Sequence, residues 1–181
     1  MNYNNSWLIE KFRQGEKVQF LFFWGHQPNK DGEIDKGCLS QLWTAPFEVG
    51  GSIYKTAEHW MMAEKARLFK DENIFEQILR TNTPQEAKEK GKLIKGFDPL
   101  TWDEHKFGIV ILGNWHKFAQ NRELKDFLLE TNNSVLVEAS PMDKIWGIGL
   151  AVGDPGIGDP LQWKGENLLG YALMEVRDKL K

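Results

Sequence analysis

The chain of 181 residues contains a single cysteine, Cys38, so no disulfide can form within it. Without a pair of closely spaced cysteines we expect no structural zinc site. The four histidines lack the spacing of metal ligands, and no HExxH motif occurs. We therefore predict no metal centre and no cofactor, although a hydrated Mg²⁺ held by one or two carboxylates would leave little trace in a sequence.

Long apolar runs and a strong net charge are also absent. No stretch approaches the ~18 consecutive apolar residues of a membrane span, so we expect no membrane partner. The first residues lack a basic segment followed by an apolar core, so we expect no signal peptide and a reducing, cytoplasmic location. The formal net charge of −3 gives no global attraction to nucleic acid.

Aromatic side chains are abundant instead, with 8 tryptophans and 11 phenylalanines. Each such ring buries about 150–250 Å² when it packs in a core. Flat, rigid rings also suit a pocket that stacks a planar heterocycle or a nucleobase. Composition alone does not decide between these two uses.

Local patterns predict a mixture of helices and a few short strands. We expect strands at 17–24 and 135–139 and a hairpin with a Gly-Gly turn at 47–54. Loops are expected at 25–37 and 154–160, and helices at 56–69, 74–79, from 84 to Gly91 or Gly96, from 101 to about 118, at 121–129 and around 168–176. This order favours an α+β fold, a single helix-rich domain over residues 1–181 with a small sheet, and gives no strong parallel-sheet signal.

Three predicted helices begin with capping residues. Thr56 is placed to accept a hydrogen bond from an unpaired amide of the first turn. Thr83 is followed by proline and by Glu86, the pattern of a capping box. Thr101 and Glu104 form the same pattern before the long apolar helix, so we predict that this helix begins at Thr101.

One acidic segment, Glu138-Ala-Ser-Pro-Met-Asp-Lys-Ile-Trp-Gly-Ile-Gly149, directly follows a predicted strand. A rigid strand that opens into a loop with carboxylates, a tryptophan and glycines is a common way to build a site, because the strand fixes where the loop starts. The glycines would let a ligand approach the backbone closely. The alternative is an ordinary strand exit whose tryptophan fills the core.

Glu58 and Lys65 form a second candidate constellation, on the helix that Thr56 caps. Seven residues of helix turn through nearly two full turns, so the two side chains lie on one face. A desolvated amine beside an acid is a possible nucleophile with its proton donor. The alternative is a solvated pair on the surface of an amphipathic helix.

Lys117, Gln120 and Asn121 end the long apolar helix with a cation and two amides. Such groups are suited to hold a phosphate or sugar hydroxyls. The ordinary explanation is a helix C-terminus whose lysine complements the helix dipole and whose asparagine caps it.

Taken together, segments along nearly the whole chain resemble the NADAR family, also called YbiA-like. Their order and spacing, more than any one of them, make the resemblance specific. The matching segments are Phe22–Gly25, Cys38–Gln41, Tyr54–Glu58, Met61–Ala66, Gly96–Asp98, Trp102, Lys117–Asn121, Leu136–Gly149, Trp163–Gly170 and Leu173–Arg177. The chain departs mildly at His59-Trp60, where members often have Gln-Tyr, and at Glu166.

The resemblance implies an α+β fold and hydrolysis of N-glycosidic bonds of ribose. It points to two substrate classes: ribosylamino-pyrimidine phosphates of riboflavin biosynthesis, and ADP-ribosylated targets. It implies that Glu58, Lys65 and Asp143 are catalytic, with Glu138 as a further acid and Lys65 able to trap the sugar C1 as a Schiff base. The implied substrate-binding residues are Phe23, Gly25, Ser40, Gln41, Trp102, Lys117, Gln120, Asn121, Glu138, Ser140, Trp146 and Gly147.

The leading hypothesis is therefore an N-glycosidase whose partner is a small ribosylated or ADP-ribosylated molecule. A nucleic-acid partner is expected only if an ADP-ribosylated base is the substrate. The alternatives are a non-catalytic module that binds ADP-ribose or a nucleotide, which would not need Glu58 or Lys65, and a structural protein. The sequence predicts neither the exact substrate nor an oligomeric state.

Overall fold

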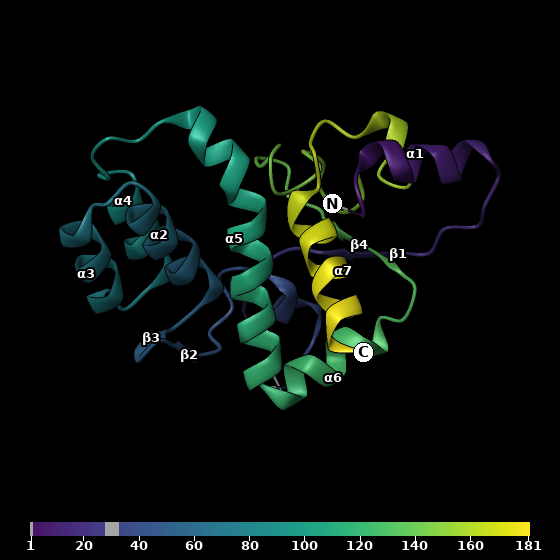
Figure 1. Ribbon diagram of the computed structural model, residues 1–181. Coiled ribbons are helices and arrows are strands. Elements are labelled where there is room, and N and C mark those ends of the chain that lie inside the picture. Colours follow the sequence, from purple (N-terminus) through teal and green to yellow (C-terminus); the bar gives the residue numbers. More distant parts are fainter. Residues whose placement is uncertain (1, 28–32) are drawn as a thin grey trace. The chain divides into compact units, whose positions relative to one another are not determined.

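The computed structural model describes residues 2–27 and 33–181 (Figure 1). Its chain divides into two compact units, which are described separately: Met1–Ser40 with Glu123–Lys181, and Gln41–Arg122. The helix-rich α+β class expected from the sequence is confirmed in the described ranges. The single domain over residues 1–181 stays a prediction. Residues 28–32 of the predicted loop 25–37 lie outside the described part of the chain.

The first unit combines a parallel strand pair with the C-terminal helix. Its elements are α1 (Asn5–Arg13), β1 (Phe20–Phe23), η1 (Lys36–Leu39), nearly all of α6 (Arg122–Glu130), β4 (Val135–Glu138), η2 (Pro160–Gln162) and α7 (Leu168–Leu180). Strands β1 and β4 pair in parallel, with Phe20 opposite Val135 and Phe23 opposite Glu138. No strong sequence signal predicted this pairing, because two four-residue strands lack the long apolar runs of large parallel sheets.

Helix α7 packs against β4 and supplies the core of the first unit. Every residue from Leu168 to Arg177 is buried, so this helix has no wide polar face. A helix that is buried all round belongs to a core rather than to a surface. The sequence showed only its apolar stripe.

Asn167 joins α7 to the outer edge of β4. Its Nδ2 donates to the Leu136 carbonyl (2.9 Å), and its Oδ1 accepts from the Glu138 amide (3.0 Å). The side chain is fully buried, and its backbone is left-handed with φ of 54°. A Cβ added at Gly170 would lie 2.1 Å from the Leu136 carbonyl oxygen, so the helix approaches the strand more closely than a larger residue allows.

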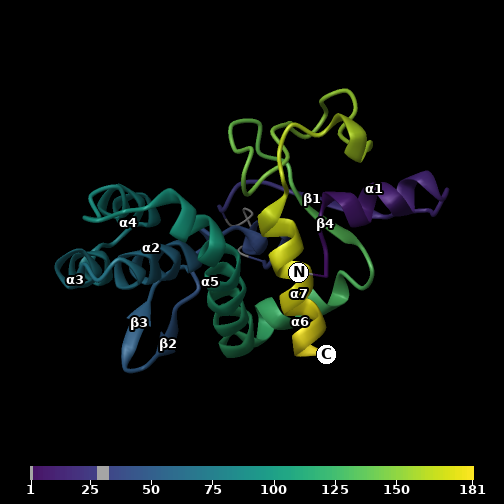
Figure 2. The same ribbon diagram turned by 45° about the horizontal axis from the view of Figure 1, so that its top comes forward.

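The second unit is built around helix α2 (Ala57–Leu68). Helices α3 (Glu72–Arg80), α4 (Pro84–Gly91) and α5 (Pro99–Gln120) pack on it, and both views show α2, α3 and α4 as neighbours (Figures 1 and 2). The predicted hairpin is present as β2 (Phe47–Val49) and β3 (Ser52–Tyr54). Trp60 fixes the crossing of α2 and α5, because a Cβ at Gly113 would lie 2.2 Å from its ring.

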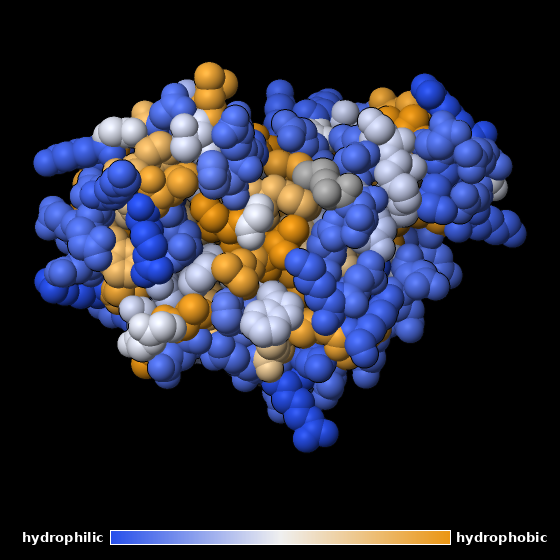
Figure 3. Space-filling view, in the orientation of Figure 1, coloured by the Kyte–Doolittle hydropathy of each residue, from blue (hydrophilic) through white to orange (hydrophobic). Residues whose placement is uncertain are grey.

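Two predicted boundaries were wrong and one helix was missed. Helix α5 begins at Pro99 with Asp98 as its cap, so the Thr101 capping box is not used. Strand β1 covers only 20–23 of the predicted 17–24. Helix α1 was not predicted, since Leu8 is its only buried residue and the surface over it is largely hydrophilic (Figure 3). The Thr56 cap and the Thr83–Glu86 capping box are confirmed.

Helices in the described part of the chain are either too short or too polar to cross a membrane.

Replacing Asn167 by alanine should lower the free energy of unfolding by about 2–4 kcal/mol, because a buried donor and a buried acceptor of β4 lose their partner. Urea unfolding followed by circular dichroism measures this change. Asn132 is the matched control, since it also has a left-handed backbone (φ 49°) but is exposed. Its replacement by alanine should cost only about 1 kcal/mol of backbone strain. Equal losses in the two variants would contradict the bridging role of Asn167.

Candidate active site

The first turn of α2 holds Glu58 in a fixed position. The Thr56 side chain accepts from the His59 amide (3.3 Å), and its Oγ1 lies 2.8 Å from His59 Nδ1. The Glu58 amide donates to the Gln41 carbonyl (3.0 Å). These bonds pair amides that a helix start otherwise leaves free, so the position of Glu58 is set by both Thr56 and Gln41.

Glu58 and Lys65 are not a solvated surface pair. Glu58 is only 4% exposed, and Lys65 is half-buried. Burial lowers the pKa of Lys65, and the negative charge of Glu58 opposes that shift. The two groups therefore sense each other electrostatically, as their spacing on one helix face predicted. A lysine with a lowered pKa is more often neutral and is a better nucleophile.

Two aromatic rings surround the Lys65 ammonium. Its Nζ lies 4.2 Å from the centroid of Phe97 and 5.5 Å from that of Trp102, and donates to the Gly91 carbonyl (3.3 Å). Ring faces attract a cation, so the rings hold the ammonium while they shield it from water. Phe97 was not predicted as a site residue. It stands in a segment that carries the family resemblance, but nothing in its spacing pointed to Lys65.

Glu64 is a second carboxylate on α2, but it belongs to a different face. Burial raises its pKa, and the positive charge of Arg67, 3.3 Å away, opposes the shift. Six residues of helix separate it from Glu58, which turns it to a side of α2 away from the Lys65 face. Its raised pKa therefore reflects burial on another face of α2 and does not assign it to the candidate site.

A buried pair of amides supports Gln41. Asn114 of α5 is fully buried and donates from Nδ2 to Gln41 Oε1 (2.7 Å) and to the Val110 carbonyl (2.9 Å). Among the described residues its Oδ1 has no hydrogen-bond partner. Because the Gln41 carbonyl accepts from Glu58, this pair helps to fix the start of α2. Asn114 was missed, although a polar residue inside a long apolar helix was an available signal.

The end of α5 holds the three polar residues predicted there. Lys117 is fully buried, and its Nζ lies 5.0 Å from the centroid of Phe118. The Gln120 amide exchanges two hydrogen bonds with the backbone of Glu48, at 2.8 and 2.9 Å. Asn121 caps the helix by donating to the Lys117 carbonyl (2.8 Å). Gln120 and Asn121 thus have structural partners, and substrate binding by all three stays a prediction.

In the first unit, the parallel register brings the ends of β1 and β4 together. Phe23 is fully buried and pairs with Glu138, the last residue of β4. Gly25 follows with a left-handed φ of 86°, a conformation that favours glycine. Ser40 ends η1 and is 7% exposed. Glu138 is held by Asn167, so its side chain starts from a fixed backbone.

Asp143 organises the acidic loop that follows. Its Oδ1 accepts from the amides of Ile145 and Trp146, both at 2.8 Å, and its carbonyl accepts from Gly149. A Cβ at Gly147 would lie 2.9 Å from both the Glu138 carbonyl oxygen and the Ser140 Cβ, so the loop folds tightly on itself. One carboxylate oxygen of Asp143 therefore has a structural partner on the loop, and its catalytic role stays a prediction.

The predicted site residues fall into two sets, one in each unit. The second unit holds Gln41, Glu58, Lys65, Trp102, Lys117, Gln120 and Asn121, and the first holds Phe23, Gly25, Ser40, Glu138, Ser140, Asp143, Trp146 and Gly147. Of these, the structure groups Glu58, Lys65 and Trp102 into one microenvironment. In residues 2–27 and 33–181, no three His, Cys, Asp or Glu side chains gather closely enough to hold a metal ion.

Comparison with known proteins places this geometry in a family. The NADAR domain family matches residues 22–181. An N-glycosidase of Acanthamoeba polyphaga mimivirus is 40% identical over 169 residues, 91% of this chain and 98% of the relative. The N-glycosidase YbiA of Escherichia coli is 35% identical over 148 residues, 81% and 82% of the two chains. The solution structure of the E. coli protein YbiA matches 91% of this chain and 86% of its own, with a TM-score of 0.72 and 30% identity.

Replacing Glu58 by glutamine should lower the pKa of Lys65 further, because the negative charge that favours the ammonium is lost. An NMR titration of the Lys65 ¹³Cε signal, assigned with Lys65→Arg, measures the change. Glu64→Gln makes the same substitution on another face of α2 and should leave the titration in place. A Lys65 titration that is equal in the wild type and in Glu58→Gln would refute the coupling.

Proposed function

The chain belongs to the NADAR domain family, and we propose that it cleaves the bond between ribose and a nitrogen of a heterocycle. It is a hydrolase of N-glycosyl bonds, the activity for which its relatives are named. The observation that carries the finer proposal is the half-buried Lys65 ammonium between Phe97 and Trp102, on the helix face of Glu58.

Glu58 is the proposed general acid for this reaction. A departing nitrogen needs a proton as its bond to C1 breaks, and the sugar C1 needs stabilisation. Glu58 is buried at the start of α2, where backbone bonds fix its main chain. A carboxylic acid whose position is fixed in this way can deliver a proton to a bound leaving group with little reorganisation.

Lys65 is the proposed trap for C1. In its neutral form the amine adds to C1 of the ring-opened sugar, and the heterocycle nitrogen leaves with the proton from Glu58. The C1–nitrogen bond to the heterocycle is then replaced by a Schiff base to Lys65. Water adds to C1 of the protonated Schiff base, and the C1–Nζ bond breaks to release the sugar aldehyde and the Lys65 ammonium. The ammonium then returns one proton to the Glu58 carboxylate, which restores the neutral amine and the acid. The lowered pKa of Lys65 supports this role, because it raises the neutral fraction.

Trp102 is the proposed stacking surface for the heterocycle. It is partly exposed, whereas Trp60 is 3% exposed and uses its indole N–H on the Ile109 carbonyl. The Lys65 amine lies beside the Trp102 ring. A flat base stacked on Trp102 would therefore place the nitrogen that carries the ribose near this amine. Two substrate classes fit these features: ribosylamino-pyrimidine phosphates of riboflavin biosynthesis, and ADP-ribosylated bases.

Turnover of the two substrate classes, measured side by side, tests the acid. We expect the purified protein to release ribose 5-phosphate or ADP-ribose from one of them. Glu58→Gln should lower kcat by about 10²–10⁴-fold, the usual contribution of a general acid. Glu64→Gln serves as the control and should keep its activity. Equal rates for the wild type and Glu58→Gln would rule out Glu58 as the acid.

Borohydride reduction during turnover tests the covalent step. The reagent should reduce a Schiff base to a stable amine, so mass spectrometry should find the sugar attached to the peptide that contains Lys65. Lys65→Arg should form no adduct and lose turnover, since arginine keeps the charge but cannot form the imine. Lys88→Arg, an exposed change on α4, is the control. Full activity of Lys65→Arg with normal substrate binding would exclude the covalent route.

A further inference from the structure

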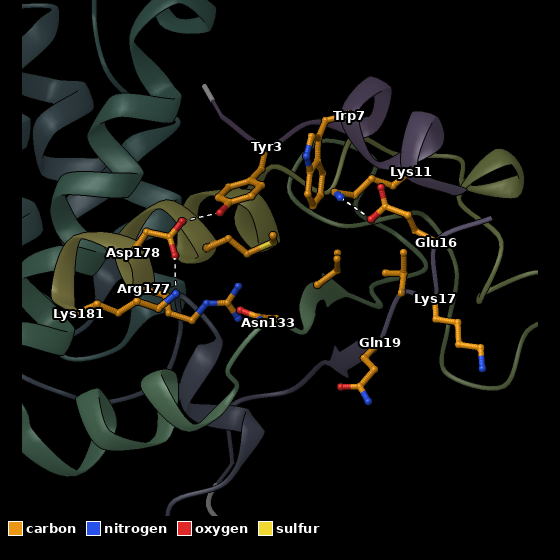
Figure 4. Close-up of a pocket in the computed structure, with 13 residues that line it drawn as sticks. Tyr3, Trp7, Lys11, Glu16, Lys17, Gln19, Asn133, Arg177, Asp178 and Lys181 are labelled. Carbon is orange, nitrogen blue, oxygen red and sulfur yellow. Dashed lines mark hydrogen bonds and ion pairs between the residues drawn. The ribbon is translucent and has the colours of Figure 1, made fainter. Parts of the chain in front are cut away.

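A hollow lies in the first unit, and none of the candidate active-site residues lines it. Its volume is about 440 Å³, within the range of about 300–1,000 Å³ typical of small-molecule sites. Its walls come from the N-terminal segment with α1, from residues 16–19 before β1, from the start of β4 and from the end of α7 (Figure 4). These segments are far apart in sequence and all belong to the first unit.

One side of the hollow is aromatic. Tyr3 and Trp7 contact each other edge to face, with ring centroids 4.9 Å apart. Both rings are only partly buried, and both project towards the hollow in Figure 4. The Lys11 ammonium lies over the Trp7 ring, with its Nζ 5.7 Å from the centroid. The arrangement offers a rigid aromatic surface with positive charge beside it.

The hollow has more positive than negative charge. Lys11 pairs with Glu16 at 2.6 Å, and Lys181 pairs with Asp178 at 3.0 Å. Two further cations line the hollow, Lys17 and Arg177, and neither has an ion-pair partner among the described residues. The lining thus carries four cations against two carboxylates, and the Asp178 carboxylate acts electrostatically on Arg177 as well as pairing with Lys181.

Arg177 is a buried, hydrogen-bonded part of the wall of this hollow rather than a surface cation. It is 2% exposed, and one guanidinium nitrogen donates to Thr131 Oγ1 (2.8 Å) and to the Ser134 carbonyl (2.9 Å). Its Nε is buried and has no hydrogen-bond partner in the described part of the chain. Both acceptors are neutral, so the hydrogen bonds orient the guanidinium without balancing its charge. Burial lowers the pKa of Arg177, and the Asp178 carboxylate, which also pairs with Lys181, opposes that shift. An anion in the hollow would further stabilise this buried cation.

We propose that this hollow binds a small phosphate-bearing molecule with a planar ring, of the size and chemistry of a nucleoside monophosphate. The phosphate interacts with Lys17 and Arg177, since the lining has more cations than carboxylates. The ring packs on Trp7. Glu58, Lys65 and Trp102 do not line the hollow. The binding site proposed here is therefore separate from the proposed hydrolysis and can be tested independently of it.

Site-resolved NMR on the full chain tests this. The indole ¹⁵N–¹H signals of the tryptophans are recorded during a titration with adenosine 5′-monophosphate, and the Trp7 signal is assigned with Trp7→Phe. We expect a saturable shift of the Trp7 signal. Adenosine and inorganic phosphate, titrated separately, should each bind about tenfold or more weakly, because each lacks one half of the contact.

Lys17→Glu is the diagnostic variant, since Lys17 is exposed and its replacement should leave the fold intact. It should weaken binding of the monophosphate by about tenfold or more. Lys88→Glu makes the same change at an exposed position of the second unit and should bind like the wild type. A Trp7 signal that does not move, moves equally with adenosine, or moves equally in Lys17→Glu would overturn the proposal.

Discussion

The arrangement of the first unit depends on the side-chain amide of Asn167. A pair of parallel strands leaves one edge of β4 without a neighbouring strand, and Asn167 provides that edge with both a donor and an acceptor. The same residue begins α7, so strand and helix are joined through one side chain. The next two amides, of Leu168 and Leu169, donate to carbonyls of Ile145 and Trp146. The acidic loop is therefore held by the start of α7, and α7 by the edge of β4.

More of the second unit than of the first could be predicted from the sequence. Local rules were enough for α2 and α4, because the caps at Thr56 and Thr83 act within one helical turn. They were not enough for α5, where Asp98 and Thr101 are both good caps and packing selects the earlier one. The parallel pairing of β1 with β4 arises from contacts between distant segments, which no local pattern reports. Helix α1 has three consecutive apolar residues, Trp7 to Ile9, which show no clear helical period, and only Leu8 is buried.

The candidate site was predictable where one helix builds it. The shared face of Glu58 and Lys65 follows from helical geometry alone, whereas their burial does not, because it depends on how α4 and α5 pack around them. The same limit applies to the tryptophans. Composition could not separate packing rings such as Trp60 from a partly exposed ring such as Trp102. The two rings differ in their contacts: the Trp60 indole N–H donates to a backbone carbonyl, and Trp102 lies beside the Lys65 ammonium. Only the folded chain defines these contacts.

The order of the two units along the chain has a consequence for synthesis. The second unit is one continuous segment, Gln41–Arg122, placed between the two parts of the first. On the ribosome, all of the second unit emerges before β4 and α7 have been synthesised. Its helices can therefore assemble while β1 has no strand to pair with. Until Val135–Glu138 have been made, Phe20–Phe23 is an unpaired apolar strand. The nascent chain is therefore most prone to aggregation through this short segment, in the interval before its last third is translated.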